Sequence, residues 1–390
     1  MRQFFSKFIK LFKILYEAKY KFKFPHQRHT IVLDLDNSYY FVKLFKKNKT
    51  FFLDTRMKEL NIIVLVYSIF KCLLKININF SKEYIINYIK FVNPKNIVTF
   101  TDNNIFFLKL KNIFKQKNLI VFQYAWRSRL TFDDMYFETR KTKFFEKFKI
   151  DYTCIWGENS KFFYSKFLDT KYLTTGSIKN NFFRYEKKLK KDSIIFISQF
   201  RMHFDYNQET KTYKKNNFKD IAIKNILNYC LKNNFKLKIL GCAKENSLYE
   251  KNYFNKLLGE KNFTFLKRNG GLSSYEHSQN YKFFITFCSS LAYELMTRGK
   301  RVAFLPWKDQ FVIRNKKIKF SESFYTNKKK TGSIWSNSSS RKEVFRVLNF
   351  ISKTKENYWK SIQKKLINPI ITYDRENKMT KKLFNELGIN

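Results

Sequence analysis

The sequence predicts an α/β protein built from two doubly wound, Rossmann-like domains. Three observations lead to this expectation. Short apolar runs of strand length alternate with helical patterns between residues 31 and 306, which is typical of parallel sheets covered by helices. The chain has 390 residues, enough for two hydrophobic cores. Hydrophobic residues make up 44% of it, which favours a folded chain over a disordered one.

Residues 1–24 mix apolar and basic side chains at helical spacing. Phe4, Phe8 and Leu15 can share one face of a helix, whereas Lys7 lies largely off that face. A basic amphipathic helix of this kind can lie on an anionic membrane surface. The alternative is a helix packed on its own domain. No apolar run approaches the roughly 20 residues of a spanning helix, and we expect no secretory signal.

Residues 25–182 are expected to form the first domain. Helical patterns at Met57–Leu74 and Ile105–Gln116 alternate there with apolar runs. The expected strands include Ile31–Asp36, Asn96–Thr101, Leu119–Gln123 and Tyr152–Trp156.

Polar side chains follow two of these strands. Asp102 and Asn103 come after the second of them, and Gln123 and Arg127 lie at and beyond the end of the third. Ligands of doubly wound sheets bind beyond the carboxyl ends of the strands. We therefore predict a ligand-binding cleft that contains Asn103, Gln123 and Arg127. Asp102 is the candidate general base because of its strand-end position.

Residues 183–192 are rich in lysine, lack an apolar period and are expected to link the first domain to a second, residues 193–350. Gln199 and Arg201 follow the first strand of this second domain, and Arg268 follows the third. The expected strands of this domain include Ser193–Ser198, Phe235–Leu240 and Phe263–Leu266.

The stretch Phe283–Pro306, FFITFCSSLAYELMTRGKRVAFLP, gives the strongest signal in the chain. A strand, a tight turn, a helix that ends at Gly299 and a second strand form one βαβ unit of a parallel sheet. The helix start points its backbone N–H groups beyond the strand ends, where a phosphate can bind. The hydroxyls of Ser289 and Ser290 could bind the same phosphate. Glu294, about 6 Å further along the helix axis, could accept hydrogen bonds from sugar hydroxyls. Taken alone, the same serines are ordinary helix caps.

Several pieces of the chain resemble a family of bacterial surface-carbohydrate biosynthesis proteins. In that family a strand ends in Ser-Ser or Ser-Thr, followed by L-x-Y-E and an R-G-K-like end, and this chain reads SSLAYELMTRGK. TFTDNN, WGENS and TGSIKNN look like the same family, whereas QYAWR lacks the glycine of its Q-N-G-x-R-like turn. Glu294, Gly299 and Pro306 resemble the acidic residue, glycine and proline that close the nucleotide-sugar site of GT-B glycosyltransferases.

The resemblance implies a GT-B-like fold, with two Rossmann-like domains that face a cleft and with helices of residues 351–390 that cross back. It implies that the first domain, residues 25–182, is the acceptor side, with Asn103, Gln123 and Arg127 in an acceptor-facing cleft. It also implies a donor site in the second domain and metal-independent transfer from a nucleotide-activated sugar to a glycan or lipid-linked acceptor, without a cofactor. The product would be a cell-surface polysaccharide or lipopolysaccharide. A glycerophosphotransferase of the teichoic-acid kind, which uses CDP-glycerol, is the alternative. The residues expected at the donor phosphates and nucleotide are Ser289, Ser290, Glu294, Gln199, Arg201 and Arg268.

The chain is strongly basic, with 78 Lys and Arg against 31 Asp and Glu and a formal net charge of +47. The basic residues are spread through every segment, and abundant Lys, Asn, Ile, Phe and Tyr are typical of an AT-rich genome. We therefore expect no nucleic-acid partner and keep an anionic membrane surface as a candidate. A non-catalytic polyanion-binding protein with a degenerate site is the third alternative.

The five cysteines are scattered without a C-x-x-C pair, which indicates a reducing, cytoplasmic setting. The inner face of the cytoplasmic membrane is the candidate place for a peripheral association. Asp34 and Asp36 spell the D-x-D of metal-dependent glycosyltransferases, but they end the first expected strand. We therefore predict no metal site.

Overall fold

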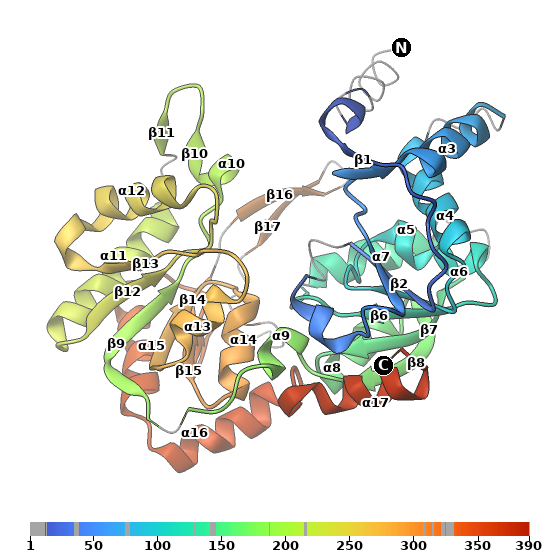
Figure 1. Ribbon diagram of the computed structural model, residues 1–390. Helices are drawn as coiled ribbons and strands as arrows, with labels where there is room; N and C mark the ends of the chain where they lie inside the picture. The colour runs from blue at the N-terminus through green and yellow to red at the C-terminus, as the bar shows by residue number, and fades with distance from the viewer. Residues whose placement is uncertain are drawn as a thin grey trace. The chain divides into compact units, whose positions relative to one another are not determined.

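The computed structural model divides the chain into two compact units, each described by itself below (Figure 1). Unit 1 contains residues 1–124, 130–175 and 377–390, and unit 2 contains residues 125–129 and 176–376. The structure describes residues 12, 14–34, 39–74, 79–127, 129–140, 146–186, 188–213, 217–306, 309–313, 316–320, 324 and 331–389.

Unit 1 is built on a parallel sheet of six strands among the described residues. In spatial order the strands are β3 (Thr50–Leu53), β2 (Thr30–Leu33), β5 (Asn96–Thr99), β6 (Asn118–Phe122), β7 (Phe148–Ile155) and β8 (Leu168–Thr174). All residues of β2 and β5 are buried, as is usual for the inner strands of a sheet covered on both faces. The chain runs outward from β2 to β3 and returns on the other side of β2 as β5, which makes the sheet doubly wound.

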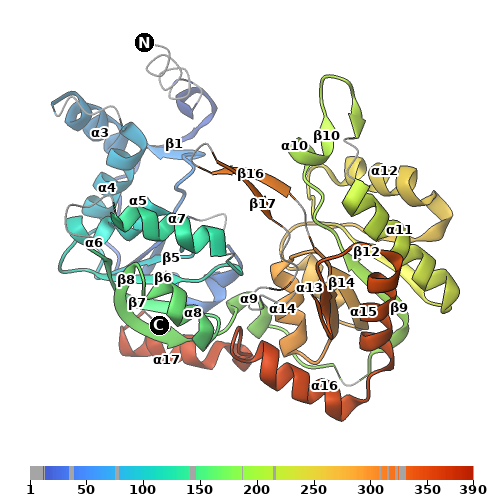
Figure 2. The ribbon, with the colours of Figure 1, turned by 180° about the vertical axis from the view of Figure 1, so that it is seen from behind.

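Helices connect these strands and flank the sheet in both views (Figures 1 and 2). A short strand, β1 (Lys19–Lys21), pairs in parallel with β4 (Glu59–Asn61), which leads directly into the first long helix. The α-helices are α3 (Ile62–Leu74), α4 (Phe80–Val92), α5 (Ile105–Leu108), α6 (Leu110–Ile113), α7 (Arg129–Arg140), α8 (Glu158–Tyr164) and α17 (Lys378–Glu386), and a 3-10 helix covers Tyr39–Leu44.

Unit 2 is built on a second sheet, of seven strands in the described part of the chain. In spatial order they are β13 (Thr264–Leu266), β12 (Lys236–Leu240), β9 (Lys190–Ile197), β14 (Tyr281–Thr286), β15 (Arg301–Phe304), β19 (Trp335–Ser336) and β18 (Thr331–Gly332). The strands from β13 to β19 are parallel, and β18 runs antiparallel to β19. The first three strands along the chain run outward from β9 to β13, and the fourth, β14, returns to the other side of β9.

The helices of unit 2 lie on both faces of this sheet (Figures 1 and 2). Two hairpins stand apart from it, β10 (Tyr206–Asn207) with β11 (Thr212–Tyr213) and β16 (Asp309–Ile313) with β17 (Lys316–Phe320). The α-helices are α9 (Ile178–Asn181), α10 (Met202–Asp205), α11 (Asn217–Lys232), α12 (Ser247–Leu258), α13 (Ser273–Ser278), α14 (Ser290–Thr297), α15 (Arg341–Lys353) and α16 (Glu356–Ile362), which continues as a π-helical turn at Gln363–Ile367.

The chain joins unit 2 at Gly176, earlier than the sequence suggested, so the expected linker 183–192 lies inside that unit. Tertiary contacts explain this boundary. Gly176 has φ +66°, and a Cβ there would lie 2.4 Å from the carbonyl oxygen of Thr372, so only glycine fits. The Tyr373 hydroxyl donates to the carbonyl of Phe183 (2.6 Å). Residues 351–376, which we expected to cross back to the first domain, also belong to unit 2.

The chain does return to unit 1 at its end, as the sequence predicted. Phe384 of α17 packs against Phe45 and Phe122, with ring centroids 4.8 Å and 6.0 Å apart. Most of the expected N-terminal helix lies outside the described residues. Lys19–Lys21, which was expected to be helical, forms strand β1 instead, because its backbone pairs with β4.

Candidate functional site

The carboxyl ends of β9 and β14 mark the point in unit 2 where the order in which the chain adds strands to the sheet reverses. After β9 the chain continues toward one edge of the sheet, and after β14 it continues toward the other. Doubly wound sheets bind ligands in the opening between two such connections. The side chain of Gln199, just after β9, ties the two ends together because its Oε1 accepts from the backbone N–H of Cys288 (2.9 Å). The predicted residues Gln199 and Ser289 therefore lie at this switch point.

Helix α14 begins there, and the predicted βαβ unit is confirmed by the parallel pairing of β14 with β15. Ser289 is its N-cap residue with extended backbone angles (φ −70°, ψ 134°), and its side chain makes no capping hydrogen bond. Ser289 and Ser290 are partly exposed, whereas every later residue of the helix is buried. The core thus fixes the helix, and its start is the part that reaches the surface, at a helix end whose N–H groups favour an anion in general.

Trp126 covers one side of this helix. Its backbone N–H donates to the Ser290 Oγ (3.1 Å), and its ring stacks on Tyr293 with centroids 5.5 Å apart and planes 7° from parallel. These contacts explain why residues 125–129 group with unit 2. Arg127, which we expected on the acceptor side, belongs to unit 2 and directly follows Trp126 in the chain. Trp126 lies in the QYAWR segment of the sequence, but no sequence pattern indicated its contacts with α14.

Two further predicted arginines follow the strands β9 and β13 of the same sheet. Arg201 is exposed beyond β9, and its backbone N–H donates to the Asp205 carboxylate (2.7 Å). Arg268, beyond β13, is half-buried and donates from Nη1 to the carbonyl of Cys242 (2.9 Å). The Arg268 guanidinium therefore helps to hold the ends of β12 and β13 together, and the Arg201 side chain is exposed beyond β9.

The end of β12 is closed to anions by the protein itself. Glu250 is fully buried, and its carboxylate accepts from the backbone N–H groups of Cys242 (3.1 Å) and Ala243 (2.9 Å). Burial raises the pKa of the Glu250 carboxyl above its ordinary value. The Glu250 carboxylate already accepts hydrogen bonds from these backbone amides. Of the ends of β12 and β14, the end of β14, where α14 starts, is therefore the better anion site.

Glu294 is buried inside unit 2, with 2% of its surface exposed. One carboxylate oxygen accepts from the Ser177 hydroxyl and the other from the Tyr275 hydroxyl (2.7 Å). Burial raises the pKa of the Glu294 carboxyl, against the influence of the Lys179 charge. The carboxylate holds three segments together, and its predicted contact with a sugar hydroxyl would need lone pairs that these two hydroxyls leave unused.

The predicted residues of unit 1 are mostly buried as well. Asp102 is 0% exposed and accepts from the Tyr124 backbone N–H (3.1 Å) and the Tyr164 hydroxyl (2.5 Å). Gln123 is buried and pairs with Trp156 through its side-chain oxygen and its backbone carbonyl, both at 2.9 Å. The geometry favours a role for Asp102 and Gln123 in fixing the strand ends, and Asn103 is the exposed member of the set.

Replacing Tyr164 by phenylalanine tests this structural role of Asp102. We expect the free energy of unfolding to fall by about 1–3 kcal/mol, because a buried carboxylate loses a hydrogen bond without gaining water. Urea denaturation measures the change. Tyr16→Phe is the control, since Tyr16 is 92% exposed, and an equal effect of both substitutions would contradict the role.

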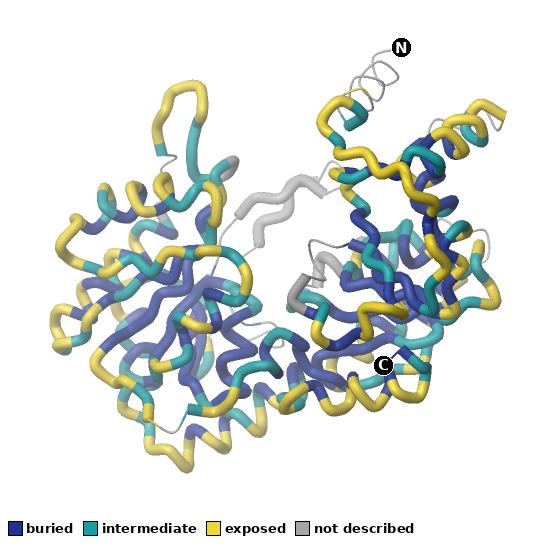
Figure 3. The backbone as a smooth tube through the Cα atoms, in the orientation of Figure 1, coloured by how far each residue is buried: buried dark blue, intermediate teal, exposed yellow. Residues whose placement is uncertain are grey.

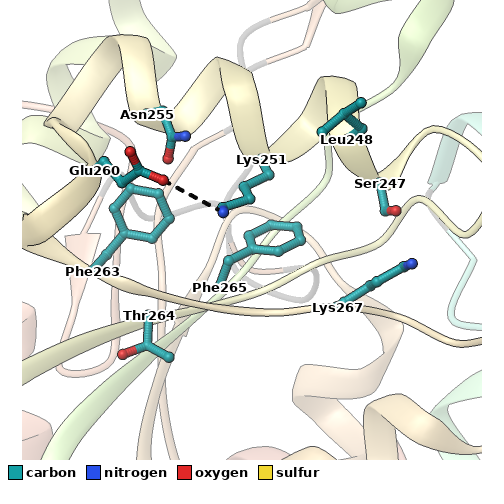
Figure 4. A pocket seen from close by; sticks show the side chains of 9 residues that line it. All are labelled: Ser247, Leu248, Lys251, Asn255, Glu260, Phe263, Thr264, Phe265 and Lys267. Carbon is teal, nitrogen blue, oxygen red and sulfur yellow. Dashed lines mark ion pairs between the residues drawn. The ribbon is translucent and has the colours of Figure 1, made fainter.

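A pocket of about 540 Å³ lies elsewhere, between α12 and the edge strand β13 (Figure 4). Phe265 and Lys267 form part of its wall, and the ammonium of Lys251 pairs with the Glu260 carboxylate at 3.5 Å. β12 and β9 separate β13 from β14 in the sheet, so this pocket is distinct from the start of α14. Within the described residues, no group of three or more His, Cys, Asp or Glu side chains could hold a metal ion.

Two Rossmann-like units in one chain, with the chain end returning to the first, define a GT-B-like protein. The sequence profile of a family described as "putative O-antigen biosynthesis protein" matches residues 119–388. The chain belongs to this family, and its role is therefore in the biosynthesis of a surface polysaccharide. This agrees with the surface-carbohydrate family that the motifs indicated.

Solved structures with the same fold are similar to this chain at low sequence identity. UDP-N-acetylglucosamine 2-epimerase from Rickettsia bellii matches with 12% identity and a TM-score of 0.51, over 93% of this chain and 96% of that one. The 2-epimerase from Methanocaldococcus jannaschii, in complex with UDP-GlcNAc and UDP, matches with 11% identity and a TM-score of 0.50, over 93% and 99%. The wall teichoic acid polymerase TagF matches with 11% identity and a TM-score of 0.51, over 93% and 89%.

These likenesses establish the fold. A comparison with curated protein sequences found no match. None of the helices within the described residues has the length and apolar character needed to span a membrane.

Proposed function

We propose that the protein is a glycosyltransferase that takes a sugar from a nucleotide-sugar donor bound by unit 2. One observation carries the proposal, namely that α14 begins at the switch point of the sheet with Ser289 and Ser290 partly exposed at its start. The helix N-terminus and these hydroxyls can bind a diphosphate. Arg127, which follows Trp126 in the chain, and Arg201, beyond the end of β9, are the basic residues that we assign to the donor phosphates. The GT-B-like fold and the O-antigen family support a donor of this class.

In the reaction, the oxygen of an acceptor hydroxyl forms a bond to the anomeric carbon of the donor sugar. The bond between that carbon and the diphosphate oxygen breaks, the nucleoside diphosphate leaves, and the acceptor proton passes to a base. Charge grows on the leaving diphosphate, and the fixed N–H dipoles at the start of α14 stabilise it without reorganisation. We do not assign the base to Asp102, because its carboxylate is buried.

A thermal-shift screen of UDP, UDP-sugars, CMP-sugars and CDP-glycerol tests donor binding. A ligand at about 100 times its Kd should stabilise the native protein by about 2.7 kcal/mol, which raises the melting temperature by several degrees. Product analysis with the hits then separates sugar transfer from glycerol phosphate transfer, the alternative that the Ser-Ser pair also suggests. Three results together would replace the proposal by the polyanion-binding alternative. DNA and heparin would stabilise the protein, no nucleotide would compete with them, and their binding would fall steeply with salt.

A further inference from the structure

Helix α3 of unit 1 exposes more large apolar side chains than it buries. Of its thirteen residues, Val64, Leu65 and Ser68 are the buried ones, and the Ser68 hydroxyl accepts a hydrogen bond from Asn87 of α4 (3.1 Å). A polar contact thus lies inside, while large apolar side chains point outward. Those exposed by between 39% and 71% are Val66, Tyr67, Ile69, Phe70, Leu73 and Leu74.

Aromatic residues extend this apolar surface beyond the helix. Phe22 and Phe24, just after β1, are 72% and 57% exposed. The rings of Phe24 and Tyr67 both lie 5.4 Å from the ring of Phe91, which joins the two parts. β1 also pairs with β4, the strand that runs directly into α3. Figure 3 shows exposed backbone along β1 and along parts of α3. Apolar surface gathered in one place marks an interaction site.

The same surface is basic at its border and contains no acidic residue on α3 or β1. Lys19 and Lys23 are exposed, and the Lys71 ammonium lies 5.5 Å from the centre of the Tyr67 ring. Lys21 pairs with Glu59. Lysines that border an apolar surface keep their ammonium groups in water while their stems follow the apolar side chains.

We propose that α3, β1 and residues 22–24 form a membrane-docking surface for an anionic lipid bilayer. The exposed side chains of Phe70, Leu73 and Leu74 enter the boundary between headgroups and acyl chains, and the lysines contact lipid phosphates. Charge favours a bilayer over a second copy of the chain, because self-association would bring Lys19 and Lys23 of two strongly basic molecules together. The surface uses none of the residues at α14 and does not depend on the proposed donor site.

Vesicle flotation with the full-length protein tests the proposal. We expect binding to vesicles of phosphatidylglycerol and phosphatidylcholine and much weaker binding to phosphatidylcholine alone. Leu73→Ser with Leu74→Ser should weaken binding by about tenfold or more, since two exposed leucines no longer leave water. The matched control is Leu231→Ser with Leu248→Ser, two leucines of unit 2 that are 60% and 66% exposed, and it should bind as the wild type does.

A charge-reversal pair supplies the second arm of the test. Lys19→Glu with Lys23→Glu should weaken binding to the anionic vesicles and reduce its salt dependence, whereas Lys224→Glu with Lys232→Glu, on the exposed part of α11, should change it less. Equal effects of both lysine pairs, or unchanged binding by the α3 variant, would overturn the proposal. The proposal would also be overturned if the wild type does not bind vesicles and sediments as a dimer, while the Leu73→Ser, Leu74→Ser variant sediments as a monomer.

Discussion

Replacing Ser289 by aspartate is expected to abolish nucleotide binding while leaving unit 2 at least as stable as before. Aspartate is as good an N-cap residue as serine, and its negative charge at a helix start is favourable by about 0.3–1 kcal/mol. The same charge would lie where we place the donor diphosphate. Two like charges about 4 Å apart near a protein surface repel by about 4 kcal/mol, so we expect affinity to fall by at least a hundredfold. Calorimetric titration with the best ligand of the screen measures the loss.

The matched control is Ser340→Asp at the start of α15. Ser340 is also an N-cap residue of unit 2 whose side chain makes no capping hydrogen bond, and it follows the antiparallel end of the sheet rather than the switch point. The substitution should stabilise its helix in the same way without affecting the ligand. If Ser289→Asp binds nucleotides as tightly as Ser340→Asp does, the diphosphate does not bind at α14.

The sequence sufficed to predict the two doubly wound units and the βαβ unit around α14. Each of those strands is a short apolar run between clear turn signals, and the Gly299 stop and the Ser-Ser turn mark both ends of the helix. The start of α14 was found for the same local reason. β1 was missed because its strand character depends on pairing with β4, about forty residues later in the chain, which no local pattern reveals.

The environment of the site residues depends on partners that are distant in sequence. Spacing placed Glu294 one turn after Ser290 but could not show that the hydroxyl of Ser177, 117 residues away, binds its carboxylate. The TGS motif that contains Ser177 was noticed only as a family resemblance. Likewise, the nearly uninterrupted apolar sequence of α3 is typical of a buried helix, and only the tertiary structure shows that six of its thirteen residues are exposed.

Replacing Glu294 by alanine is expected to destabilise unit 2 by about 2–4 kcal/mol, because two buried hydroxyls lose their acceptor and a cavity forms. The pairs involved join residues from three segments of unit 2, namely Ser177, Tyr275 and α14 itself. Urea denaturation followed by tryptophan fluorescence measures the loss. Glu294→Gln keeps the volume and one acceptor, so it should cost less than the alanine and suits binding measurements. A fall in nucleotide affinity of more than about tenfold in Glu294→Gln would support the predicted ribose contact, and an unchanged affinity would leave Glu294 a positioning residue.

The pH dependence of stability distinguishes a buried carboxyl from an exposed one. Burial raises the pKa of Glu294 in the folded protein, so the native state holds this proton more tightly than the unfolded chain. The corresponding contribution to stability is complete at low pH and is lost as pH rises from the ordinary carboxyl range through the raised pKa. Glu294→Gln should remove that decline. Glu343 is the control with the opposite sign, because hydrogen bonds from Arg346 lower its pKa and its contribution is lost as pH falls. If Glu294→Gln and the wild type show the same slope, the carboxyl is not buried as the structure has it.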